Sequence, residues 1–205
     1  MTARIAAFDV DGTITSRDCV VPFMRRVTGA RRIVPRLAAR PDRLLPVLAA
    51  RDRDALKELA AMAAFTGRTH DELAAAGTSF ARTVHERWLR SDTLASLHAH
   101  LDDGDHVVLV SASFETYLRP LAELLGVEAV LSTRLEVVDG VATGKLWGAN
   151  CRGPEKVRRL HDWLRDHHGG RSNTHVVAYG DSAGDRELLA DADDAHWVTP
   201  DGAAA

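Results

Sequence analysis

The sequence predicts an α/β protein: a parallel sheet with helices on both faces, in three layers, and a helical unit inserted after the first strand. Three observations support this class. A short apolar run, residues 5–8, stands near the start of the chain. Residues 16–89 are rich in Ala, Leu and Arg and contain no convincing strand. From residue 106 onward, short apolar runs alternate with helical patterns, as in parallel β–α units.

The first strand, residues 5–8, leads directly into two aspartates two positions apart, Asp9 and Asp11. Because side chains alternate along an extended chain, both carboxylates are expected to point the same way, into the crevice beyond the carboxyl end of the strand. Gly12 then allows the sharp turn that the chain needs at this point.

The inserted unit is expected to consist of several helices, because its apolar residues follow a helical period. Prolines are expected to break it at three places: Pro35, Pro41 and Pro46. The chain therefore divides into a core, residues 1–15 and 90–205, and a helical insertion, residues 16–89.

The rest of the core is expected to alternate strands and helices. The expected order is a strand over residues 106–110, a helix over 114–125, a strand over 127–131, a hairpin of 135–138 and 141–143, a helix from 153, a strand over 175–178, a helix over 186–190 and a strand over 195–198. Asp139 followed by Gly140 is the dipeptide that favours a two-residue hairpin turn. Pro154 and Glu155 are typical of the first turn of a helix.

Composition narrows the class of protein further. With 205 residues, of which 45% are apolar and 27% charged, the chain suits one sizeable core with a modest insertion. A formal net charge of −3 gives no indication of nucleic-acid binding, although the charge is unevenly spread along the chain. Cys19 and Cys151 are far apart and have no metal-ligand spacing, so we expect small buried thiols in a reducing cytoplasm. No apolar segment is long enough to span a bilayer, so no integral membrane segment is expected.

Two carboxylates as close as Asp9 and Asp11 repel each other unless a cation neutralises one and a proton the other. That arrangement suits a metal-assisted nucleophile beside a general acid. The same Asp-x-Asp-Gly pattern also opens calcium-binding loops, but such a loop ends in a glutamate and here Val20 stands near that end, so the calcium alternative is disfavoured.

Three further groups lie at strand ends or helix starts, and each has a plainer alternative. Ser111, with the backbone N–H groups after it, forms an anion site at a strand-to-helix junction, unless Ser111 or Ser113 caps the helix. Asp181 and Asp185 follow another strand, as site acids or as turn and cap residues.

Lys156 lies in a first helical turn, where a cation needs a nearby anion, unless it is a solvated surface lysine. A parallel sheet would bring the three strand ends together, which favours a common site over the separate alternatives.

In this order, the acid pair, the hydroxyl, the lysine and the second acid pair resemble the four motifs of the haloacid dehalogenase superfamily. The resemblance is to subfamily IB, the phosphatases similar to phosphoserine phosphatase, and it covers nearly the whole chain. It implies a Rossmann-like three-layer core, with residues 16–89 as the cap domain.

The resemblance also implies a mechanism. Asp9 would attack a phosphate monoester and form an aspartyl-phosphate, and Asp11 would act as general acid and then as general base. Mg²⁺ would be bound by Asp9, the backbone carbonyl of Asp11 and Asp181. Asp185 would orient a metal-bound water or the lysine. The phosphate oxygens would be bound by three groups: Ser111, the backbone of Ala112, and Lys156.

Departures from the subfamily bear on the substrate. Ser111, Ala112 and Ser113 stand where the phosphoserine phosphatases have Ser-Gly-Gly, and Gly184 replaces an Asn. Asp18 takes the place of a glutamate that meets the substrate amine, and it either contacts the substrate or caps a helix. We therefore expect a small phosphorylated metabolite, phosphoserine-like or not. The alternatives are a lipid-phosphate phosphatase, a phosphotransferase with the same intermediate, and a non-catalytic phosphate sensor, which the intact motifs disfavour.

The insertion is unusually basic. Its arginines greatly outnumber its aspartates over this stretch: Arg25, Arg26, Arg31, Arg32, Arg36, Arg40, Arg43, Arg51 and Arg53 against Asp42, Asp52 and Asp54. A basic amphipathic stretch is typical of peripheral contact with anionic lipid, and long arginine side chains equally cover a solvated helix face. Lys57 either reaches the substrate or lies on the surface.

Overall fold

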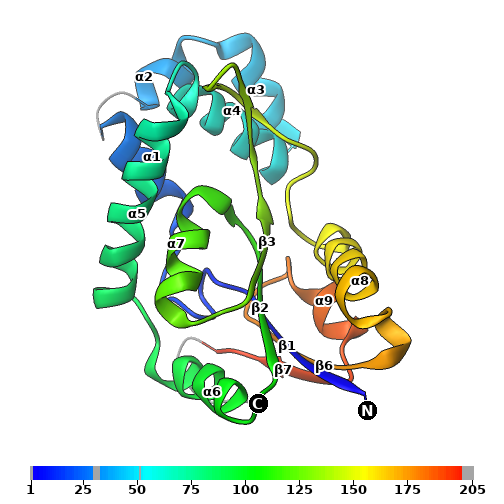
Figure 1. Ribbon diagram of the computed structural model, residues 1–205. Helices are drawn as coiled ribbons and strands as arrows, with labels where there is room; N and C mark the ends of the chain where they lie inside the picture. The colour runs from blue at the N-terminus through cyan, green and yellow to red at the C-terminus, as the bar shows by residue number, and fades with distance from the viewer. Residues whose placement is uncertain (1, 30–32, 51, 200–205) are drawn as a thin grey trace.

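A five-stranded parallel sheet forms the centre of the protein (Figure 1). The structure, a computed structural model, describes residues 2–29, 33–50 and 52–199. The strand order is β3-β2-β1-β6-β7, so β1 lies in the middle. The strands are β1 (Ala3–Phe8), β2 (His106–Phe114), β3 (Ala129–Thr133), β6 (Thr174–Gly180) and β7 (Asp194–Trp197). The predicted α/β class is confirmed.

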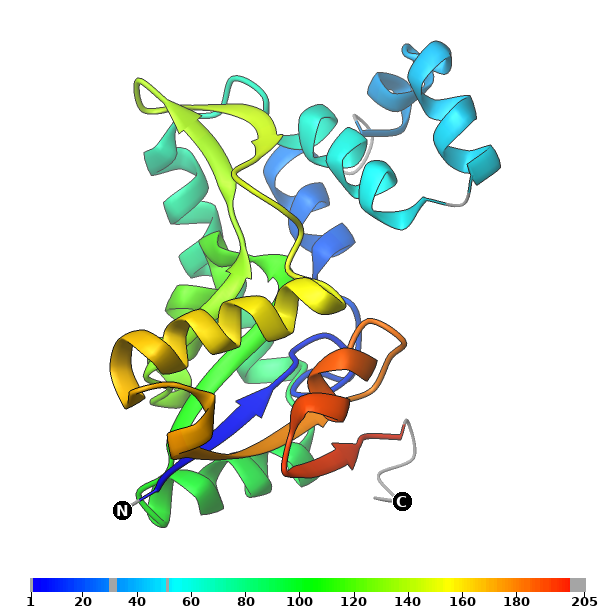
Figure 2. The ribbon, with the colours of Figure 1, turned by 90° about the vertical axis from the view of Figure 1, so that its right-hand side faces the viewer.

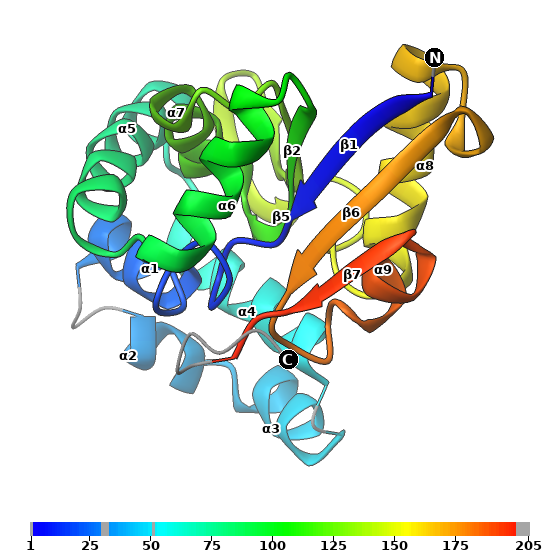
Figure 3. The ribbon, with the colours of Figure 1, turned by 90° about the horizontal axis from the view of Figure 1, so that it is seen from below.

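Helices cover both faces of the sheet (Figure 3). Because side chains alternate along a strand, Phe8 in β1 belongs to the apolar core on the face covered by α6 (Ser91–Asp102) and α7 (Glu115–Leu125), and α5 (His70–Arg87) packs on α7. Ile5 belongs to the core on the other face, with α8 (Pro154–His168) and α9 (Arg186–Asp191). These are the three predicted layers. The central strands β1, β2 and β6 bury apolar side chains on both faces, as expected for a parallel sheet that helices cover, whereas the edge strand β7 is exposed.

The segment between β1 and α6 is helical, as predicted. It contains α1 (Val20–Thr28), α2 (Ile33–Ala38), α3 (Pro41–Ala50) and α4 (Arg53–Phe65), followed by α5. The prediction that Pro35 and Pro46 break helices is wrong, because Pro35 lies in the first turn of α2, where its missing N–H has no partner to lose, and Pro46 lies inside α3. Pro41 does begin a helix. How the chain divides into domains stays a prediction.

A two-stranded hairpin follows β3 and packs against the helical segment. Strands β4 (Leu135–Val138) and β5 (Val141–Leu146) are antiparallel, and the turn residues Asp139 and Gly140 both have positive φ, 50° and 77°. This is the tight turn that the dipeptide predicted. The backbone N–H of Gly67, just beyond α4, donates to the carbonyl of Ala142 at 2.9 Å. The hairpin therefore lies against α4 (Figure 2).

Both cysteines, Cys19 and Cys151, are free and buried, in agreement with the prediction of small buried thiols. Among the helices of residues 2–29, 33–50 and 52–199, none is long and apolar enough to cross a membrane.

Candidate active site

The carboxyl ends of β1, β2 and β6 meet at one edge of the sheet, because β1 pairs in parallel with both neighbours. Asp9 follows β1, Ser111 lies near the end of β2, and Asp181 follows β6. Gly12 has φ +87°, and a Cβ atom built there would stand 2.2 Å from Oδ2 of Asp181. Glycine is therefore needed here both for the turn and for the close approach of the two strand ends.

Lys156 joins the first and last acids of the site. It is 1% exposed, and its Nζ lies 2.5 Å from Oδ1 of Asp9 and 2.5 Å from Oδ1 of Asp185. The surface alternative for Lys156 is therefore wrong. The lysine is placed by the first turn of α8, which begins at the positive φ of Gly153.

Burial and charge act on these groups in opposite directions. Burial raises the pKa of Asp9, Lys156 lowers it, and the neighbouring Asp185 and Asp11 raise it; the net shift is upward. Burial alone would lower the pKa of Lys156, but the charges of Asp9 and Asp185 outweigh it, so that pKa rises. A bound cation would favour the ionised form of Asp9, which is the form that a carboxylate nucleophile requires.

The Asp11 carboxyl has hydrogen-bond partners other than Lys156. Its Oδ1 accepts from the backbone N–H of Cys19 at 3.0 Å, and its Oδ2 accepts from the Ser113 hydroxyl at 2.5 Å. The hydroxyl of Tyr117 donates to that serine in turn, at 2.5 Å. Burial raises the pKa of Asp11 to about 6, against the effect of the Ser113 hydrogen bond. A carboxyl that keeps its proton at mildly acidic pH suits a general acid.

Ser111 belongs to the end of β2 and does not cap the following helix. The strand is irregular between Ser111 and Phe114, and α7 begins at Glu115 with no side-chain cap. The capping alternative for Ser111 and Ser113 is therefore wrong. Ser111 is 1% exposed and accepts a hydrogen bond from the backbone N–H of Ser113 at 3.1 Å, which fixes its hydroxyl at the site.

Three carboxylates lie close enough to share a cation. Ligand oxygens of Asp9, Asp181 and Asp185 all lie within 4.8 Å of one another. These hard oxygen donors fit Mg²⁺. Both oxygens of Asp185 already have partners, Lys156 on Oδ1 and Ser182 on Oδ2, which suits an orienting residue more than a direct ligand. Its carboxylate does not cap α9, so that alternative is wrong for Asp185.

Burial raises the pKa of Asp181, and the charge of Asp185 adds to the shift. Stabilisation of the ionised acid by a cation would reverse such a shift. The Asp11 carboxylate lies outside this acid cluster, so the predicted role of Asp11 as a ligand concerns its backbone carbonyl alone.

Two residues of the helical insertion lie near the site in different ways. Asp18 is exposed, and its two oxygens accept from the backbone N–H groups of Val20 and Val21, both at 3.2 Å, so it caps α1 as one alternative proposed. Its contact with substrate stays a prediction.

Lys57 reaches from α4 into the core, where its Nζ contacts the carbonyl of Ala112, Oγ1 of Thr133 at 3.1 Å and Oδ1 of Asn150 at 2.5 Å. Burial lowers the pKa of Lys57 to about 8, while the charge of Asp11 acts in the opposite direction. The surface alternative for Lys57 is wrong.

Sequence reasoning missed Arg152. It lines a cavity of about 90 Å³ together with Asp9, Asp11 and Asp185, the Ser111–Ala112 turn and Lys156. A Cβ atom at Gly184 would stand 3.1 Å from Nε of Arg152, so the glycine that departs from the subfamily pattern leaves room for this guanidinium. The sequence offered one indication of this role: an arginine stands four positions before Lys156, and Gly184 stands where the subfamily has a larger residue.

Comparisons with known proteins agree with this arrangement. A profile of the haloacid dehalogenase-like hydrolases matches residues 6–190. The chain belongs to this family. Protein CicA of Caulobacter vibrioides is 34% identical to it over 195 residues, 93% of this chain and 83% of that protein. Phosphoserine phosphatase SerB1 of Mycobacterium tuberculosis is 28% identical over 202 residues, 96% of this chain and 65% of that protein.

The likeness extends to solved structures. A protein of unknown function from Bordetella pertussis Tohama I has a TM-score of 0.74 and 26% identity, over 93% of this chain and 87% of that one. The predicted membership of the haloacid dehalogenase superfamily, with a likeness to phosphoserine phosphatase, is confirmed. As a haloacid dehalogenase-like hydrolase related to phosphatases, the chain is an enzyme of the phosphatase type.

Proposed function

We propose that this haloacid dehalogenase-like protein is a Mg²⁺-dependent phosphomonoesterase that acts through an aspartyl-phosphate on a small phosphorylated metabolite. The observation that carries the proposal is the separation of the two acids. Asp9 contacts Lys156 in a cluster of carboxylates, whereas Asp11 is half-buried against Ser113 and Cys19. Burial raises both pKa values, that of Asp9 to about 7 and that of Asp11 to about 6, so the partners make the assignment. Lys156 and a bound cation would favour the ionised form of Asp9, the nucleophile, whereas Asp11 has neither partner and would keep its proton as the acid.

In the first step, a carboxylate oxygen of Asp9 forms a bond to phosphorus while the bond from phosphorus to the leaving oxygen breaks. Asp11 gives its proton to that oxygen, so an alcohol leaves. In the second step, Asp11 takes a proton from water, the water oxygen bonds to phosphorus, and the bond to Asp9 breaks. Inorganic phosphate is released and both carboxyls return to their starting states.

The remaining residues supply charge and position. Asp9, Asp181 and the backbone carbonyl of Asp11 would hold Mg²⁺, which when bound withdraws charge from the phosphoryl oxygens. Lys156 and Ser111 would bind those oxygens, with backbone N–H groups at Ala112. Lys156 also fixes Asp9 by direct contact, and Asp185 fixes Lys156. We add Arg152 to the phosphate-binding set because its side chain lines the same cavity.

The size of the cavity indicates which part of the substrate it can hold. About 90 Å³ is well below the roughly 300 Å³ of ordinary small-molecule sites, so the cavity suits a phosphoryl group, and the rest of the substrate would be met by the helical insertion. We propose residues 16–89 as this cap, in contact with the core residues 1–15 and 90–205. Lys57 enters the core from α4, and its ammonium suits a substrate with a second anionic group. A phosphorylated amino acid, as in the name of SerB1, is one such substrate.

A small phosphorylated substrate and two free buried thiols agree with a reducing cytoplasm, which we propose as the compartment.

The test is hydrolysis of a panel of phosphorylated amino acids, sugars, cyclitols, nucleotides and lysophospholipids. Activity is expected to vanish with chelator and to return with Mg²⁺. Asp9→Asn should lower kcat at least about a hundredfold, roughly 3 kcal/mol of barrier, because it removes the nucleophile at almost constant volume. Asp102→Asn, the same change at an exposed site, is the control.

Acid quenching of the wild-type reaction should trap phosphate on the protein, and Asp9→Asn should trap none. Undiminished turnover by Asp9→Asn, or its labelling to the wild-type level, would show that another group attacks. Added acceptor alcohols separate hydrolysis from transfer, because a phosphotransferase would give a new phosphate ester.

A further inference from the structure

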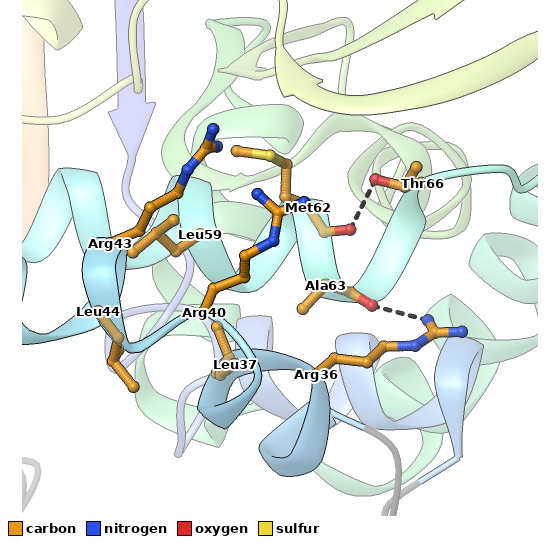
Figure 4. Close-up of a pocket in the computed structure, with 9 residues that line it drawn as sticks. All are labelled: Arg36, Leu37, Arg40, Arg43, Leu44, Leu59, Met62, Ala63 and Thr66. Carbon is orange, nitrogen blue, oxygen red and sulfur yellow. Dashed lines mark hydrogen bonds between the residues drawn. The ribbon is translucent and has the colours of Figure 1, made fainter.

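A second cavity lies in the helical insertion, away from the catalytic acids. It encloses about 310 Å³ between α2, α3 and α4 (Figure 4). Its lining residues are Arg36, Leu37, Arg40, Arg43, Leu44, Leu59, Met62, Ala63 and Thr66. The catalytic cavity shares none of these residues. At 310 Å³ the space falls at the lower end of the roughly 300–1,000 Å³ that small-molecule pockets enclose.

One side of this cavity is cationic. Arg40 and Arg43 extend toward Met62, and Arg36 donates from Nη1 to the carbonyl of Ala63 at 2.8 Å (Figure 4). In the part of the chain that the structure describes, no carboxylate oxygen lies within 4.0 Å of these three guanidinium groups. Arg40 and Arg43 extend to the same side of the cavity, and an anion bound between them would be stabilised by both charges.

The other side is apolar and incompletely packed. Leu44, Leu59 and Met62 are only half-buried. Helix α3 contains no buried residue at all among residues 41–50. A helix of ten residues gains little stability by itself and usually depends on a buried apolar face. The structure therefore leaves an apolar wall to be covered beside the guanidinium groups.

We propose that this cavity binds a small anionic amphiphile, with an anionic head on Arg40 and Arg43 and an apolar part of several carbons on Leu44, Leu59 and Met62. Guanidinium groups bind carboxylate, sulfate and phosphate through paired N–H donors. A solvated arginine face would account for the charge alone, whereas here the exposed arginines line a cavity that also has an apolar wall. The head could belong to a free metabolite or to a membrane lipid, since both present the same chemistry.

The test uses n-octyl sulfate, which is not a phosphate ester, below its micelle concentration and in the presence of chelator. Calorimetric titration of the full chain should give saturable binding. The double variant Arg40→Gln/Arg43→Gln should bind about tenfold more weakly or worse, since two charge-assisted contacts are lost. Arg82→Gln/Arg87→Gln, with the same change of charge at exposed positions of α5, should bind as the wild type does.

The apolar wall has its own test. Leu44→Gln should weaken the binding of octyl sulfate several-fold and leave the binding of inorganic sulfate unchanged, because it alters only the apolar wall that the alkyl tail would cover. Octyl glucoside, with the tail but no charge, should bind much more weakly than octyl sulfate. Equal binding of octyl sulfate to wild type and Arg40→Gln/Arg43→Gln, octyl glucoside as tight as octyl sulfate, or no saturable binding would each overturn the proposal.

Vesicles distinguish the two sources of the head group. The cavity would be assigned to a membrane lipid if the wild type sedimented with phosphatidylglycerol vesicles but not with phosphatidylcholine vesicles, and if Arg40→Gln/Arg43→Gln sedimented with neither. Octyl sulfate binding without vesicle capture would assign it to a free amphiphile. Neither result depends on turnover, so the proposal stands or falls separately from the catalytic function.

Discussion

Replacement of Asp11 by asparagine should make the metal-free protein more stable near neutral pH while impairing turnover. Burial raises the pKa of Asp11 from 3.8 to about 6 in the folded state. The folded protein therefore holds this proton more tightly than the unfolded chain does. Between pH 4 and 6 the free energy of unfolding falls as pH rises, and above pH 6 the loss is complete. Asparagine has no proton to lose and removes this cost.

The size of the effect follows from the shift. A difference of about two pKa units is worth about 3 kcal/mol, and partial access of water to Asp11 reduces this to roughly 1–3 kcal/mol. The hydrogen bonds survive the change: an amide oxygen accepts from the N–H of Cys19, and an amide N–H donates to the hydroxyl of Ser113. Asp11→Asn should therefore exceed the wild type in unfolding free energy by that amount at pH 7.5 and match it near pH 4.

Urea unfolding with chelator at pH 4, 5, 6 and 7.5 measures this difference. The control, Asp102→Asn at an exposed position, should stay within about 0.5 kcal/mol of the wild type. In parallel, Asp11→Asn should lose more activity on an alkyl phosphate than on nitrophenyl phosphate, whose leaving group needs little protonation. A variant no more stable than the wild type at pH 7.5, or a difference independent of pH, would refute the reasoning.

Three other outcomes are expected. Lys156→Met leaves Asp9 and Asp185 buried without their cation, so it should lower the free energy of unfolding by about 3–5 kcal/mol in chelator, with partial recovery in Mg²⁺. Urea unfolding measures this, and equal stability of the variant with and without Mg²⁺ would contradict the acid cluster as a cation site. Asp181→Asn should raise the Mg²⁺ concentration for half-maximal activity more than Asp185→Asn does, and the opposite order in a Mg²⁺ titration would exchange their roles. Gly12→Ala, strained at φ +87° and forced against Asp181, should lose activity and metal affinity together; a wild-type Mg²⁺ titration would disprove the contact.

Local sequence patterns were enough for most of the sheet. Short apolar runs predicted β1, β2 and β6, because strands that helices cover on both faces are continuously apolar. The Asp139–Gly140 dipeptide predicted the hairpin, because few residue pairs adopt two successive positive φ angles. Helix α6 was missed, although Leu94, Leu97 and Leu101 recur at helical spacing. Prolines were weighted too heavily, because Pro46 is accommodated within α3.

The convergence of Asp9, Asp11, Ser111 and Asp181 could be predicted from the sequence, because a parallel sheet brings strand ends to one edge whatever the side chains between them. The pattern could not show which group would partner which. Lys156 and Ser111 each had a plainer local alternative, and only burial in the assembled sheet excluded it.

The sequence by itself determined most of the elements, the family motifs and the order in which the candidate site groups follow one another. Only the tertiary structure decided that Lys57 reaches the Ala112 turn from α4, that Arg152 lies beside Gly184, and that Ser113 holds the Asp11 carboxyl. The physical reason is that local propensities act over a few residues, whereas these contacts join positions 30 or more apart and depend on how helices pack against the sheet.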